Sequence, residues 1–115
     1  MANKFENIPK LTAKIDQMLQ YENSKVKAIA SVSIGNVFAV HGIKVIEGPH
    51  GLFLRMPQSV YEKNGTKQYQ DLFHPVTAEA RQAIDDMVLS AYQVKRKEME
   101  AKLYSEELPF QGQQM

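Results

Sequence analysis

The chain has 115 residues, of which 43% are hydrophobic and 23% charged, with a formal net charge of +1 and no cysteine. This length fits a single domain, and the lack of cysteine excludes disulfides, thiol catalysis and cysteine-ligated metals. No apolar run reaches membrane-spanning length and residues 1–10 lack an apolar signal core, so we expect a cytoplasmic protein without a membrane partner.

The charge is unevenly distributed along the chain. Residues 1–24 sum to 0, residues 25–76 to +3, residues 77–97 to +1 and residues 98–115 to −3. The body is therefore mildly basic and the C-terminal end acidic. This balance permits nucleic-acid binding but does not require it.

The first segments have little distinctive pattern. Residues 1–10 are polar, and we expect them to be flexible. Residues 8–20 fit two structures: Ile8, Leu11 and Ile15 recur at helical spacing, whereas Leu11, Ala13 and Ile15 alternate as in a strand. The local pattern slightly favours a helix and leaves a strand open.

Residues 25–57 have the strongest strand pattern. Apolar and polar residues alternate from Lys25 to Ile34, and Gly35-Asn36 tolerates the positive φ of a tight turn. A return strand is predicted over residues 37–46 and a third over residues 52–56. These three strands form an antiparallel meander.

The return strand is apolar on both faces, with Val37, Ala39, Ile43 and Val45 on one and Phe38, Val40 and Ile46 among those on the other. We therefore expect it to be central and covered on both sides, with a bulge or close backbone approach at Gly42. One helix does not easily cover both faces of a small sheet. A second subunit would, which predicts a homodimer.

The second half of the chain predicts a hairpin and a helix. Asn64-Gly65 lies in the polar stretch 58–67, and a short last strand follows over residues 69–73. Thr77 is a suitable N-cap for a long amphipathic helix. The predicted apolar stripe of this helix is Ala80, Ile84, Met87, Val88 and Ala91. Residues 105–115 are expected to form a flexible acidic tail.

The predicted fold is thus α+β, with an antiparallel meander sheet of about five strands and one long C-terminal helix. The pattern contains no catalytic constellation, because His41, His50 and His74 have neither metal-ligand spacing nor a companion motif. We expect no enzyme activity, no metal, no cofactor and no small-molecule substrate.

Four segments carry a family resemblance. AIASVSI, FAVHGIKVIEG, GLFLRMP and DLFHPVTAEAR occur in an order and spacing that resemble the SpoVG (stage V sporulation protein G, septation protein) family, from about Lys25 to Tyr92 with a weaker fit from Leu11 to Ser24. The resemblance implies a strand in the ambiguous N-terminal segment and one domain over residues 11–104. It also implies a small bacterial dimer that binds DNA and RNA as a regulator linked to sporulation and septation.

The resemblance further implies where nucleic acid would bind. In the family, contacts are associated with a basic pair after the Met-Pro of the GLF…MP motif and with a basic residue early in the helix. Here polar residues follow Met56-Pro57, and the nearest bases are Lys63 and Lys67. Arg81 matches the helix position. For each lysine, the preferred interpretation is still a solvated surface residue without a binding role. For Arg81, a solvated surface residue and a nucleic-acid contact are left as equal alternatives.

Two functions from different classes follow from these observations. The first is a non-catalytic nucleic-acid-binding regulator with Lys63, Lys67 and Arg81 at the interface. The alternative is a dimeric adaptor that binds protein and whose positive residues are incidental. Salt-dependent retention on heparin would distinguish them.

Overall fold

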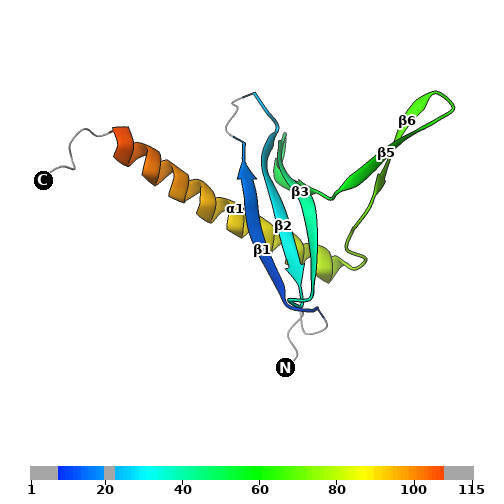
Figure 1. Ribbon diagram of the computed structural model, residues 1–115, viewed down its shortest axis with the longest axis horizontal. Helices are drawn as coiled ribbons and strands as arrows, with labels where there is room; N and C mark the ends of the chain where they lie inside the picture. Colours follow the sequence, from blue (N-terminus) through cyan, green and yellow to red (C-terminus); the bar gives the residue numbers. More distant parts are fainter. Residues whose placement is uncertain (1–7, 20–22, 108–115) are drawn as a thin grey trace, which may run out of the picture.

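The computed structural model describes residues 8–19 and 23–107, with side chains as far as residue 102. Within these residues, six strands are followed by one long helix (Figure 1). The elements are β1 (Leu11–Met18), β2 (Val26–Ile34), β3 (Phe38–Gly48), β4 (Gly51–Arg55), β5 (Gln58–Lys63), β6 (Thr66–Asp71) and α1 (Ala78–Glu107).

The strands form two antiparallel sheets. One has four strands in the order β1-β2-β3-β4, and the other is the two-stranded hairpin β5-β6. The α+β class, the meander order and the long C-terminal helix are therefore confirmed. The single sheet of about five strands divides into four strands and a separate hairpin, because the chain leaves the sheet after Met56.

Residues 11–18 are a strand, as the family resemblance implied. Leu11 pairs with Ile34 and Ile15 pairs with Ala30, so β1 runs antiparallel along β2. Leu11, Ala13 and Ile15 are partly buried and pack against the core. Long-range pairing thus overrides the slight local preference for a helix.

Strand β3 is interior to the sheet, as predicted, and it contains the predicted bulge. Ala30 pairs with Ile43 but Val32 pairs with Val40, so β3 has one residue more than β2 between these pairs. Gly42 lies at this point with a φ of +85°. The extra residue shifts the alternation, so the predicted division of faces is wrong: Val40 packs toward the core, as do Ile43 and Val45.

Helix α1 crosses one face of the four-stranded sheet (Figure 1). The Thr77 hydroxyl accepts a hydrogen bond from the Ala80 amide at 3.0 Å, which confirms the predicted N-cap. Among the helical side chains described, as far as residue 102, the buried ones are Ile84, Val88 and Tyr92, so the stripe continues through Tyr92, whereas Met87 is exposed. The sheet contributes Ala28, Ala30, Val32, Ile43, Val45 and Leu54 to the same core.

The opposite side of the four-stranded sheet is here called the open face. No part of α1 covers it, so the two-sided cover predicted for β3 is not found within one chain over the described residues. At the start of β3, Phe38 is 70% exposed. The predicted flexible ends lie largely outside the described residues, although residues 105–107 of the predicted tail continue α1.

Candidate nucleic-acid interface

The β5–β6 hairpin projects from the sheet as an arm (Figure 1). Its base is fixed to the core: Met56 is buried, and the Pro57 carbonyl accepts a hydrogen bond from the Leu72 amide at 2.7 Å. Across the first pair of the ribbon, the Gln58 amide donates to the Asp71 carboxylate at 2.9 Å. Pro57 also lies beside Gly42, where an added Cβ would be 3.8 Å from the Pro57 Cβ.

The tip of the arm is the predicted Asn64-Gly65 turn. Both residues have positive φ, 55° and 78°, as a two-residue hairpin turn requires. Lys63 pairs with Thr66, and Lys67 pairs with Glu62. Because side chains alternate along a strand, these neighbouring pairs project from opposite faces of the ribbon. Lys63 and Lys67 are therefore exposed at the tip, one on each face.

Arg81 lies elsewhere, in the first turns of α1 beneath the sheet. Its guanidinium donates to the Leu54 carbonyl at 3.4 Å and forms an ion pair with Asp85, also at 3.4 Å. Figure 1 shows the start of α1 well away from the tip of the arm. The structure thus brings Lys63 and Lys67 to one tip but does not place Arg81 with them.

The charge of Arg81 is partly compensated by its neighbour. Burial raises the pKa of the Asp85 carboxyl above its ordinary value of 3.8, and Arg81 opposes that rise by favouring the charged form. One Asp85 oxygen, Oδ1, is buried without a hydrogen-bond partner among the described residues. Arg81 therefore fixes the helix to β4 and stabilises a half-buried carboxylate, which makes it a weaker phosphate ligand than a free cation.

The open face contains a cation pair that the sequence analysis did not identify. Lys44 on β3 pairs directly with Arg55 on β4. Their neighbours Val45 and Leu54 are buried toward α1, so the two cations project from the open face, where both are exposed. Within the described part of the chain neither has an ion-pair partner. Arg55 is also close to the base of the arm, two residues before Pro57.

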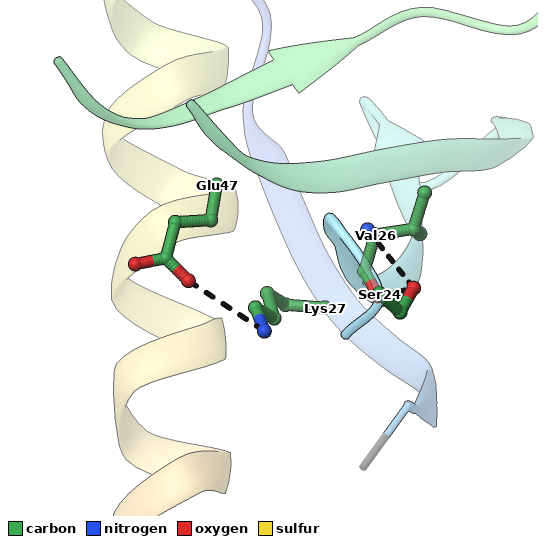
Figure 2. Close-up of polar contacts among 4 residues, drawn as sticks. All are labelled: Ser24, Val26, Lys27 and Glu47. Atoms are coloured by element: carbon green, nitrogen blue, oxygen red, sulfur yellow. Dashed lines mark hydrogen bonds and ion pairs between the residues drawn. The ribbon is translucent and has the colours of Figure 1, made fainter. Parts of the chain in front are cut away.

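Two other cations of the body, Lys27 and Arg96, form ion pairs with carboxylates. Figure 2 shows Lys27 and Glu47 pointing toward one another in front of α1, with 3.5 Å between Nζ and Oε1. Arg96 and Glu100 form an ion pair one turn apart on the helix, at 3.2 Å. Lys95 and Lys97 on α1 also have no ion-pair partner among the described residues, so what sets Lys44 and Arg55 apart is that they lie directly opposite each other on neighbouring strands.

The described residues contain no group of three or more His, Asp or Glu side chains arranged to hold a metal ion. Of the histidines, His41, His50 and His74 are all exposed, and they lie on β3, in the β3–β4 turn and before Pro75 respectively. Over the same residues, no helix combines the length and apolarity needed to cross a membrane.

Comparison with known protein families identifies the family of this chain. The SpoVG family profile matches residues 11–94, from the start of β1 to the middle of α1. The chain belongs to the SpoVG family. The match includes the arm, Lys44, Arg55 and Arg81, so every candidate residue described above lies in the SpoVG region.

Three relatives illustrate the degree of similarity, each named "Putative septation protein SpoVG". The one from Clostridioides difficile is 48% identical over 71 residues, 62% of this chain and 74% of the relative. The one from Archaeoglobus fulgidus is 55% identical over 71 residues, 62% and 80% of the two chains. The one from Clostridium acetobutylicum is 41% identical over 83 residues, 72% and 84% of the two chains.

Proposed function

We propose that this SpoVG-family chain is a non-catalytic, nucleic-acid-binding regulator that acts in the cytoplasm, in the control of septation and sporulation. Membership of a family whose relatives are named as septation proteins supports the cellular role. The observation that carries nucleic-acid binding is the pair formed by Lys44 and Arg55, two exposed cations directly opposite each other without an anion partner among the described residues.

Two like charges directly opposite on neighbouring strands destabilise a sheet. A phosphate bound between Lys44 and Arg55 would remove this repulsion and release counterions from the nucleic acid. Lys63 and Lys67 add one cation to each face of the arm, whose base follows directly after β4. Phosphate contacts of this kind position a protein without reading sequence, so affinity for many sequences is expected.

Elution from heparin tests this proposal. The Lys44→Gln/Arg55→Gln double variant should elute at a clearly lower salt concentration than the wild type, because two of the four proposed phosphate ligands are lost. Lys97→Gln, which removes an exposed lysine from α1, is the control and should lower the elution salt much less. Wild-type protein that flows through heparin at low salt would contradict nucleic-acid binding and favour the protein-binding adaptor.

We also propose that the chain forms a homodimer. The open face lacks a covering helix, and Phe53 on it is 40% exposed beside Ile46. Strands β1 and β4 are both edges of the four-stranded sheet, which natural proteins usually cover or blunt. Sedimentation equilibrium at micromolar concentration should give twice the chain mass of 13.1 kDa. A single species at the monomer mass would refute the dimer.

A further inference from the structure

The arm has a near-palindromic sequence around its turn. The last residues of β5 before the tip are Tyr61-Glu62-Lys63, and the segment of β6 that leads away from the tip is Lys67-Gln68-Tyr69. In each strand the tyrosine and the lysine are two residues apart, so they share one face of the ribbon about 7 Å apart.

The hairpin register places these two units on opposite faces. Tyr61 pairs with Gln68, and the next pair toward the base is Val60 with Tyr69. Consecutive pairs project from alternate faces, so Tyr61 lies with Lys63 and Tyr69 lies with Lys67. Each face of the arm therefore carries one aromatic ring and, one step nearer the tip, one cation.

Neither ring is used to build the core. Tyr61 is 46% exposed and Tyr69 61% exposed, whereas the core tyrosine Tyr92 is buried. A two-stranded hairpin is only marginally stable alone, and these two exposed aromatic rings add little to its stability. Large exposed rings beside a cation are typical of surfaces that bind a partially apolar, anionic partner.

The charge of the arm argues against binding by electrostatics alone. Over residues 58–71 the two lysines are balanced by Glu62 and Asp71, so the arm has no net charge. A surface that only followed a phosphate backbone would be expected to carry an excess of cations. Stacking on aromatic rings provides attraction that does not depend on net charge.

We propose that the arm binds single-stranded nucleic acid, with one unpaired base stacked on Tyr61 and another on Tyr69. Lys63 and Lys67 contact the phosphates next to these bases. This inference rests on the proposed function and adds to it the strandedness of the partner. A duplex is disfavoured because the faces of its bases are stacked on one another, whereas a single strand exposes them to protein side chains.

The test is fluorescence anisotropy with labelled oligothymidylate of about 12 nucleotides, the corresponding oligouridylate and a duplex of equal length. Tyr61→Leu/Tyr69→Leu should weaken binding to the single strands by about tenfold for each tyrosine, with an unchanged salt slope. Tyr61→Phe/Tyr69→Phe keeps both rings and should bind as the wild type does. The duplex should bind more weakly and be insensitive to both variants.

The readouts distinguish the stacking of bases on the arm from the proposed nucleic-acid-binding function. Loss of single-strand binding in the leucine variant but not the phenylalanine variant supports stacking. The tighter binding of either oligothymidylate or oligouridylate shows whether the partner is DNA or RNA. Unchanged binding by a folded leucine variant, or equal wild-type affinity for duplex and single strand, overturns stacking and leaves phosphate binding intact. A leucine variant that instead loses its dimer in sedimentation assigns the arm to the subunit interface and overturns the inference. Wild-type protein that binds no probe in a salt-sensitive way overturns the proposed function itself.

Discussion

Replacing Leu54 with Ala is expected to lower the free energy of unfolding by about 3 kcal/mol, the typical loss for a large-to-small change in a core. Leu54 lies on β4, is 3% exposed, pairs with Val45 on β3, and belongs to the core between the sheet and α1. Removing its side chain leaves a cavity where the helix meets the strand that leads into the arm. Its carbonyl, which accepts the bond from Arg81, is unaffected by the substitution.

Leu72→Ala is the matched control, because the same atoms are removed from a side chain that is 67% exposed. That variant should change the free energy of unfolding by no more than about 0.5 kcal/mol. Urea unfolding of all three proteins at one protein concentration measures both differences, since a dimer's stability depends on concentration. Equal losses in the two variants would show that Leu54 is not part of the core.

Raising the salt concentration from 50 to 200 mM is expected to weaken nucleic-acid binding by about 150-fold on duplex DNA for each protomer engaged, and by about 50-fold on a single strand. These values follow if Lys44, Arg55, Lys63 and Lys67 each contact one phosphate. Arg81 is left out because its guanidinium is already paired with Asp85. A titration of labelled oligonucleotide at several salt concentrations gives the slope directly. A loss of only a fewfold would mean that most of these cations do not contact phosphate.

The alternating pattern in residues 25–57 was sufficient to predict the meander, because period-two hydrophobicity directly reflects one buried and one solvated face. It failed at one point for a physical reason. The bulge at Gly42 adds a residue to β3, so a strict alternation assigns Val40 to the wrong face. Gly42 itself was the correct signal of the bulge, but a sequence does not show on which side of it the alternation restarts.

Strand β5 was not predicted, because its sequence has no hydrophobic alternation at all. Residues 58–63 do not pack against the core, and Val60, the apolar residue between polar neighbours, is 55% exposed. A strand that buries neither face has no hydrophobic period to detect. Its turn was nevertheless predicted, since Asn64-Gly65 is favoured by local backbone conformation alone.

The candidate site was only partly accessible from the sequence. Lys63 and Lys67 were found because they lie near the turn, but Lys44 and Arg55 are 11 residues apart and meet only through the β3–β4 register. The sequence analysis did predict two adjacent strands joined by the turn after Glu47, and this prediction could have indicated the pair. Arg81 was found by its match to a motif, and its spacing of four residues from Asp85 on the predicted helix was the signal for the ion pair that the structure shows.

The most direct test of the central claim is the salt slope of the variant that replaces Lys44, Arg55, Lys63 and Lys67 with glutamine, compared with that of the wild type. On single-stranded oligothymidylate the wild type should give a slope of log affinity against log salt of about −2.8 for each protomer engaged, from four contacts. The folded variant should give a slope near zero with much weaker binding at low salt. A variant that retains the wild-type slope and affinity would contradict the claim that these four cations form the nucleic-acid interface.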